Sequence, residues 1–308
     1  MYLIPEEFGI EGRKEYSTER SWLIGSIIGK GGTAVCYEAV CGKKTGILKE
    51  FAPYLGRNGD RVRMEDFLLP YHEIDRIRME NPEARIINNY LPPYEILYSF
   101  DSENGKKKEV FIWMPDPRKG MTLKDFLISD EFAGLSSRDS CILNMAISLT
   151  ECVMVFHSVG LYDLDIKPSN LLVFFPSRNN MDSCMISLFD IDTIEICREY
   201  EESEKLRLGT IRAFKVTDGF SAPELYSGDG DYRSDIYSIG TVIYSALYSG
   251  RENGIETYKE NAECADRIHR LEKGMEDVLM KTLNHNPNKR YDSCEDLLMD
   301  LRKQCQQR

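Results

Sequence analysis

The side chains best suited to chemistry lie in residues 161–174, L-Y-D-L-D-I-K-P-S-N-L-L-V-F. Pro168 is incompatible with a helix interior and Asn170 disfavours one, so we predict a rigid loop that leads into a strand. This loop holds a carboxylate, a cation and an amide at fixed spacing, in Asp165, Lys167 and Asn170. Phosphoryl transfer requires these three groups, to orient a hydroxyl, to balance phosphate charge and to bind a metal. A charged surface turn is the alternative interpretation, because short motifs also occur by chance.

Composition limits the classes of protein that this chain can belong to. Its 308 residues, 42% hydrophobic and 29% charged, are enough for one large domain or two lobes. A net charge of −12 argues against nucleic acid or an anionic membrane as the main partner. No apolar run reaches membrane-spanning length and residues 1–7 lack a signal-peptide pattern, which predicts a cytoplasmic protein. The nine cysteines include no C-x-x-C pair, so reduced thiols are predicted instead of disulfides or a zinc site.

A glycine cluster lies near the start of the chain. Apolar residues flank Gly29, Gly31 and Gly32, and then alternate with polar ones up to Ala39. This pattern predicts a strand, a glycine turn and a second strand. Glycines allow backbone N–H groups to approach phosphate oxygens, although an ordinary hairpin would show the same pattern.

Two charged residues follow on elements that could bring them together. A predicted third strand, residues 46–51, carries Lys49, where a phosphate-binding lysine would be needed. An exposed edge charge is the alternative. A helix predicted to begin near Pro70 and end before residue 81 carries Glu73, which could pair with Lys49. The rival partners for the lysine are Glu65 and Glu80. The apolar face of this helix consists of Tyr71, Ile74 and Ile77.

The remaining pattern predicts a hinge at residues 115–117 and a mainly helical second part. The predicted helices are 121–127, 141–157, 234–249, 274–283 and 294–306, and the predicted strands are 94–100, 109–114, 171–174 and 185–189. Asp190 leaves the last strand, so its carboxylate could bind a divalent ion together with Asn170. Asp235 lies in a nearly apolar helix and requires hydrogen bonds there. His157 is predicted to pack and not to react.

Taken together, these motifs resemble the eukaryotic-type serine/threonine protein kinases over residues 22–306. Gly29-Lys30-Gly31 resembles the glycine-rich loop, with Ala34 in place of its third glycine. The other matching positions are Lys49 and Glu73, the catalytic-loop residues Asp165, Lys167 and Asn170, the metal-binding Asp190, the triplet Ala222-Pro223-Glu224, Asp235 and Gly240 (with Tyr237 for tryptophan), and Arg290.

The resemblance implies an α+β, bilobal protein-kinase-like fold. An arm at 1–21 would precede a small β-rich N-lobe with one main helix, 22–114, and a larger, mostly helical C-lobe, 115–308. ATP would bind between the lobes with Mg²⁺, or Mn²⁺ as the alternative metal, and the adenine would lie near the hinge. The implied nucleotide-binding residues are Ile28, Gly29, Lys30, Gly31, Gly32, Ala34, Cys36, Lys49, Trp113, Met114, Asn170, Leu172 and Asp190.

The resemblance also implies a role for each catalytic residue. Lys49, held by Glu73, would contact the α- and β-phosphates. Asp165 would orient the acceptor hydroxyl and Lys167 would neutralise the transferred phosphoryl group. Thr217, bonded to Asp165 and Lys167, favours serine or threonine over tyrosine as the acceptor in a protein substrate. Asn170 and Asp190 would be the metal ligands.

Two motifs depart from the family pattern. Asp163-Leu164-Asp165 takes the place of the family's H-R-D motif. The missing arginine removes the usual anchor of a phosphorylated activation loop, as in kinases of the non-RD type. Asp190-Ile191-Asp192 takes the place of the family's D-F-G motif. This D-x-D form resembles that of a group of bacterial kinase-like proteins. These changes leave open a pseudokinase that binds nucleotide as a scaffold. A kinase of small alcohols is a further alternative, but that class lacks the A-P-E triplet and its arginine partner.

Overall fold

The computed structural model describes most of the chain after residue 22. The described residues are 23–30, 34–51, 54–55, 61–62, 68–80, 82–100, 107–115, 121–162, 165–175, 184–191, 195–196, 216–227 and 230–306. The predicted N-terminal arm lies outside these ranges.

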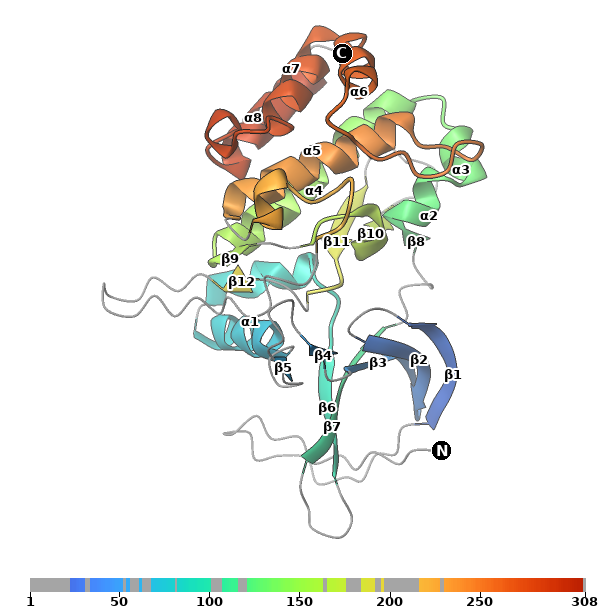
Figure 1. Cartoon of the computed structure of the whole chain (residues 1–308). Coiled ribbons are helices and arrows are strands. Elements are labelled where there is room, and N and C mark those ends of the chain that lie inside the picture. The colour runs from blue at the N-terminus through green and yellow to red at the C-terminus, as the bar shows by residue number, and fades with distance from the viewer. Residues whose placement is uncertain are drawn as a thin grey trace, which may run out of the picture.

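The N-terminal part is built on a five-stranded antiparallel sheet in the order β1-β2-β3-β7-β6 (Figure 1). Its strands are β1 (Leu23–Lys30), β2 (Ala34–Cys41), β3 (Lys44–Phe51), β6 (Glu95–Phe100) and β7 (Lys107–Pro115). Alternation of apolar residues places Ala39, Leu48 and Leu97 in the buried layer. A separate two-stranded sheet joins β4 (Tyr54–Leu55) and β5 (Arg61–Val62). The two strands predicted to flank the glycine cluster are confirmed by the antiparallel pairing of β1 with β2.

One helix of this part, α1 (Leu69–Glu80), ends just before the 3₁₀ helix η2 (Pro82–Asn89). The predicted apolar face is confirmed, because Tyr71, Ile74 and Ile77 are all buried. The hydroxyl of Tyr94 donates to the backbone oxygen of Tyr71 at 2.8 Å and lies 2.9 Å from Oδ1 of Asp75. These bonds hold α1 to the chain segment that enters β6.

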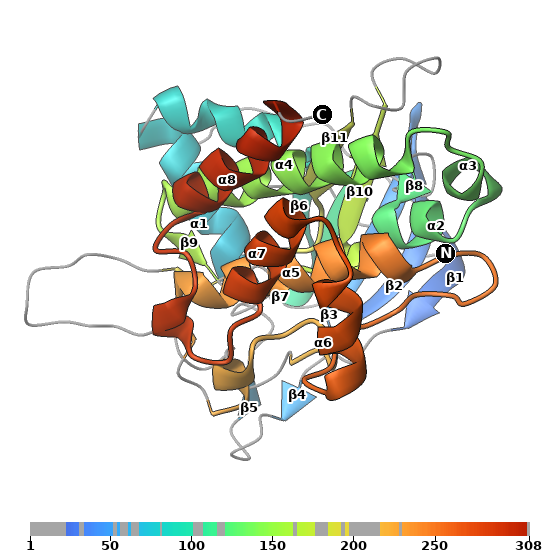
Figure 2. The same cartoon turned by 90° about the horizontal axis from the view of Figure 1, so that it is seen from above.

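The C-terminal part is mainly helical (Figures 1 and 2). Its central helix α4 (Arg138–His157) contacts α5 (Tyr232–Tyr248) and α8 (Cys294–Gln306). The remaining helices are α2 (Leu123–Leu127), α3 (Asp130–Ala133), α6 (Ala262–His269) and α7 (Lys273–Thr282). By length and composition alone α4 could cross a membrane, but two-thirds of its apolar stretch is buried inside the fold. The predicted α+β class, with a sheet-rich first part and a helical second part, is confirmed.

Short strands carry the loops of the candidate site. β10 (Leu171–Phe174) pairs with β11 (Met185–Leu188) on one side and with β8 (Met121–Thr122) on the other. β9 (Leu161–Tyr162) pairs with β12 (Glu195–Ile196). The sequence pattern predicted one helix over 121–127, but β8 occupies its first two residues because they pair with β10.

The close contact of α5 with α7 depends on Gly240. A Cβ at this position would lie 2.5 Å from Oγ1 of Thr282 and 3.0 Å from Cδ2 of Leu283. We therefore expect Gly240→Ala to lower the free energy of unfolding by about 1–3 kcal/mol despite alanine's higher helix propensity. Urea denaturation would measure this change. The matched control is Gly250→Ala, where nothing lies within 4 Å of the new Cβ. Equal stability of the two variants would contradict the packing argument.

Candidate active site

The loop before β10 places two functional groups, an amine and an amide, around one carboxylate. Asp165 has a φ of 44°, the left-handed region that few residues other than glycine, asparagine and aspartate adopt readily. Its Oδ2 accepts hydrogen bonds from Nζ of Lys167 at 2.7 Å and from Nδ2 of Asn170 at 3.0 Å. The Asp165 side chain is only 4% exposed, so the lysine is needed to balance its charge.

A second chain segment completes this arrangement. The hydroxyl of Thr217 donates to Oδ1 of Asp165 at 3.2 Å and accepts from Nζ of Lys167 at 3.1 Å. Thr217 is itself fixed by a turn, because its N–H donates to Oγ of Ser221 and its carbonyl accepts from the Ser221 N–H. The structure therefore shows the contacts among Asp165, Lys167 and Thr217 that the family resemblance implied.

Asn170 and Asp190 lie at the same end of the β10–β11 pair. Leu171 pairs with Leu188, and the N–H of Phe189 donates to the carbonyl of Asn170 at 3.2 Å. Because Nδ2 of Asn170 is bonded to Asp165, the amide oxygen is the atom left for a metal. An amide oxygen and a carboxylate are the hard donors that Mg²⁺ prefers. No cluster of three or more His, Cys, Asp and Glu side chains occurs among the described residues, so phosphate oxygens and water would complete the coordination.

Lys49 connects the sheet to this metal position. It lies on β3 opposite Cys36 of β2, is 8% exposed, and its Nζ is 2.9 Å from Oδ1 of Asp190. Glu73 on α1 is 4% exposed, and its carboxylate accepts from the Arg76 guanidinium one helical turn away. The predicted pair between Lys49 and Glu73 stays a prediction.

The predicted nucleotide-binding positions line neighbouring strands. Gly29 pairs with Cys36 and Lys30 follows it on β1, with Ile28 before it. No described atom lies within 4 Å of where a Cβ of Gly29 would be. Ala34 and Leu172 are buried at 4% each, on β2 and β10. Trp113 and Met114 lie in β7, paired with Leu48 and Ile47 of β3. Two nucleotide-binding positions, Gly31 and Gly32, lie outside the described residues. The same is true of Glu65, the rival partner of Lys49, and of Asp163, Leu164 and Asp192 in the two motifs that depart from the family pattern.

Comparison with known proteins identifies the family. A model of the protein kinase domain matches residues 22–308. This chain belongs to the protein kinase family. It is 22% identical to a probable serine/threonine-protein kinase of Clostridium perfringens over 90% of its length, and 23% identical to a probable serine/threonine-protein kinase PknB of Bifidobacterium longum over 91%. The chain spans only 37% and 39% of the length of these relatives.

A solved structure shows the same fold. The crystal structure of the Mycobacterium tuberculosis PknI kinase domain matches with a TM-score of 0.53 and 16% sequence identity, covering 92% of this chain and 96% of that one. The sheet-rich first part and the helical second part are therefore arranged as in a protein kinase domain.

The kinase's A-P-E triplet lies in a buried ion pair. Glu224, in the 3₁₀ helix η5 (Pro223–Tyr226), accepts from Nη1 and Nη2 of Arg290 at 2.6 and 2.9 Å. It also accepts from the Ser234 hydroxyl at the start of α5 at 2.7 Å. The pairing of Glu224 with Arg290 predicted from the sequence is confirmed, and it fixes the segment that follows Thr217.

Sequence reasoning missed the partner of Asp235. Nε2 of His157 at the end of α4 lies 2.9 Å from Oδ2 of Asp235, and Nδ1 faces the Cys294 sulfur at 3.6 Å. Burial and the Asp235 carboxylate raise the pKa of the Cys294 thiol, which favours its neutral form. The unfavourable burial of Asp235 in an apolar helix indicated that a partner was needed. His157 lies 78 positions away in the sequence, so the local pattern could not identify it as that partner.

Proposed function

We propose that this chain transfers the γ-phosphoryl group of ATP to serine or threonine hydroxyls of protein substrates. The observation that supports this most directly is the buried Asp165 carboxylate held by Lys167, Asn170 and Thr217. A carboxylate fixed in this way can orient a hydroxyl and accept its proton. Residues 22–114 would form the nucleotide-binding lobe and residues 115–308 the substrate-binding lobe.

Each residue of the centre would act through charge and position. Lys167, 2.7 Å from Asp165, would balance the charge of the phosphoryl group in transit. Lys49 would exchange its contact with Asp190 for the α- and β-phosphates, which leaves that carboxylate to the metal. Mg²⁺ would neutralise phosphate charge when bound by Asn170 and Asp190. Thr217 would hold the side chains of Asp165 and Lys167 in a fixed relative orientation, because it bonds both.

Two finer features belong to the same proposal. Leu164 replaces the arginine that anchors a phosphorylated activation loop, so this kinase would be of the non-RD type and would not depend on loop phosphorylation. Asp192 would place an extra carboxylate beside the metal, as in the bacterial D-x-D group.

The test is transfer of labelled γ-phosphate from Mg-ATP to a basic protein, followed by identification of the phosphorylated amino acids. We expect phosphoserine or phosphothreonine, and at least about 100-fold less transfer by Asp190→Ala, because a metal supplies several kcal/mol of transition-state stabilisation. The matched control is Asp266→Ala, an exposed aspartate on α6, which we expect to leave transfer unchanged. Absence of transfer by the wild-type chain, or equal transfer by Asp190→Ala, would favour the scaffold alternative.

A further inference from the structure

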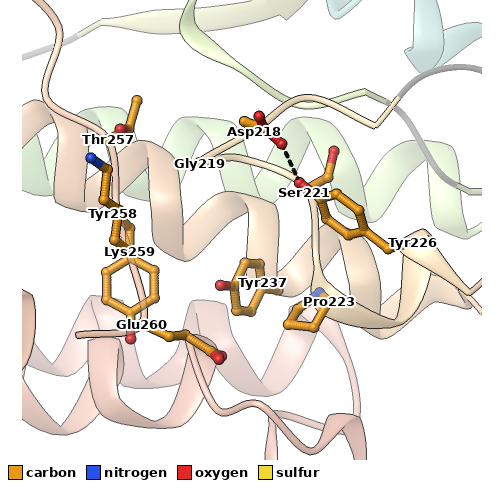
Figure 3. Close-up of a pocket in the computed structure, with 10 residues that line it drawn as sticks. All are labelled: Asp218, Gly219, Ser221, Pro223, Tyr226, Tyr237, Thr257, Tyr258, Lys259 and Glu260. Carbon is orange, nitrogen blue, oxygen red and sulfur yellow. Dashed lines mark hydrogen bonds between the residues drawn. The ribbon is translucent and has the colours of Figure 1, made fainter.

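A pocket of about 590 Å³ is lined by residues that directly follow Thr217 in the chain and by three other segments. Figure 3 shows its lining. One wall is the turn 218–221, and another is the loop 257–260 that precedes α6. Pro223 and Tyr226 of η5 and Tyr237 of α5 complete the lining. No residue of the proposed phosphoryl-transfer machinery lines this pocket, so its chemistry is not explained by ATP or metal binding.

The pocket is coupled to the centre by a single tight turn. Asp218 follows Thr217 directly, and Thr217 bonds Asp165. The N–H groups of Phe220 and Ser221 both donate to the carbonyl of Thr217, so the wall of the pocket is built on the residue that positions the carboxylate. An extended chain advances about 3.3 Å per residue. A substrate segment that presents its hydroxyl to Asp165 would therefore reach the pocket within a few residues.

The two walls are held in a fixed relation. Gly219 has a φ of 79°, and a Cβ at this position would lie only 2.6 Å from Cβ of Thr257 on the facing loop. Only glycine allows both this conformation and this approach. The pocket is therefore formed by close packing of its own walls and does not require a ligand to assemble it.

The lining combines aromatic surface with carboxylates at opposite ends. Tyr237 is 5% exposed and Tyr258 is half-buried. Their rings meet edge-on, with an angle of 71° between the ring planes, so Tyr258 offers the more exposed aromatic surface of the two. Asp218 and Glu260 lie at opposite ends of the ring of lining residues in Figure 3, and both are exposed. The amino group of Lys259 points toward Thr257, away from the Glu260 carboxylate (Figure 3). The lysine therefore does not neutralise that end of the pocket.

Hydrogen bonds orient both carboxylates. Oδ1 of Asp218 accepts from the Tyr226 hydroxyl at 2.7 Å, and Oε2 of Glu260 lies 2.9 Å from Nδ1 of His285. Burial and then the charge of Glu260 raise the pKa of Tyr258 to about 12, and the same two causes raise the pKa of Tyr237. The negative field of Glu260 therefore reaches the aromatic surface between the two ends.

We propose that this pocket binds lysine or arginine side chains of the protein substrate, and so selects basic sequences near the phosphorylated residue. The aliphatic part of such a side chain would lie against the ring of Tyr258, and its cationic head would meet Asp218 or Glu260. The net charge of −12 would assist the approach of a basic segment. This inference rests on the proposed function, because it names the substrate class of the same centre.

Peptide binding tests the proposal without any need for turnover. The probes are short fluorescent peptides with a central alanine in place of serine, and with lysine, alanine or glutamate placed at each other position in turn. Fluorescence anisotropy with the full chain would give each Kd. We expect lysine at one or more positions to bind at least about tenfold more tightly than alanine, and glutamate to bind more weakly than alanine. This preference should decrease as salt is added.

Charge variants locate the preference in the pocket. In the double variant Asp218→Asn/Glu260→Gln the lysine preference should disappear, and Glu260→Lys should shift the preference toward glutamate. The matched control is the double variant Glu263→Gln/Asp266→Asn, which removes the same two negative charges from exposed residues of α6 that do not line the pocket. Thermal unfolding would confirm that each variant is folded. Because these peptides accept no phosphate, a failure of transfer and a failure of this inference are separate results.

Two results would overturn the proposal. One is a wild-type chain that binds lysine, alanine and glutamate peptides equally. The other is a lysine preference that survives in Asp218→Asn/Glu260→Gln, or that falls as much in Glu263→Gln/Asp266→Asn, since general attraction to an acidic protein would then explain it.

Discussion

Asp165→Asn is expected to slow phosphoryl transfer by a factor of about 10²–10⁴ while the protein remains folded. The carboxylate is the proposed acceptor of the hydroxyl proton, and an amide cannot accept one. In addition, Oδ2 accepts from both Lys167 and Asn170 while Oδ1 accepts from Thr217. An asparagine has a single amide oxygen, so its NH₂ group must face a donor on one of these sides.

Asparagine is the right substitution because of the backbone at this position. With a φ of 44°, residue 165 adopts a conformation that asparagine tolerates and that costs most other residues about 1–2 kcal/mol. Asp165→Ala would therefore combine a catalytic effect with loop strain.

Steady-state transfer of labelled phosphate measures the effect of Asp165→Asn, and calorimetric titration with Mg-ATP shows whether nucleotide binding is kept. We expect unchanged nucleotide affinity, since Lys49, Asn170 and Asp190 remain. A transfer rate close to that of the wild type would exclude Asp165 as the proton acceptor.

Local patterns were sufficient to predict the main elements and one loop of the site. Apolar residues at helical spacing predicted the buried stripes of α4 and α5, and α8 has the predicted bounds. Asp165, Lys167 and Asn170 lie within six residues of one another, so their proximity follows from the loop itself. Short elements were predicted less well. The helix α6 was not predicted, because only Cys264 and Ile268 of its eight residues are buried.

Long-range contacts could not be derived from spacing. Lys49 and Asp190 are 141 positions apart, and whether the lysine contacts this carboxylate or Glu73 depends on how the sheet lies against the β10–β11 pair. The contact of Thr217 with Asp165 was predicted only through family resemblance, since nothing local links residues 52 positions apart. The pocket beside Thr217 was not predicted at all, because its walls come from separate segments that meet at Gly219.

Arg290→Met is expected to lower the free energy of unfolding by about 3–5 kcal/mol, because it leaves the carboxylate of Glu224 buried without its counter-ion. The Arg290 side chain is fully buried, and besides Glu224 it donates to the backbone oxygens of Asn284, Arg233 and His285. A loss of this size is a large fraction of the 5–15 kcal/mol that typically stabilises a folded domain. Urea denaturation of the variant and the wild type measures it.

Two further variants separate the buried pair from general effects of charge. Arg290→Lys keeps the charge but cannot form the two-pronged contact, so we expect it to recover little of the lost stability. Arg302→Met breaks an exposed pair with Glu151 and should lower the free energy of unfolding by less than about 1 kcal/mol. If Arg290→Met were as mild as Arg302→Met, the buried pair would not stabilise the fold.

The dependence of this loss on pH identifies the group responsible. Burial alone would raise the pKa of Glu224, but hydrogen bonds from Arg290 and Ser234 outweigh it and hold the pKa below the usual 4.5. The ionised Glu224 therefore stabilises the wild type above about pH 4.5, and this contribution is lost as the pH falls through the lower pKa of the folded state. Arg290→Met removes the hydrogen bonds and the charge of the arginine but keeps the burial and the Ser234 hydrogen bond, so the pKa of folded Glu224 should be higher in the variant than in the wild type. Protonation of Glu224 at acid pH should therefore reduce the loss of stability in the variant. The difference in unfolding free energy between wild type and Arg290→Met should then narrow as the pH falls from about 7 to about 4. A constant difference over this range would show that Glu224 is not the group left without a partner.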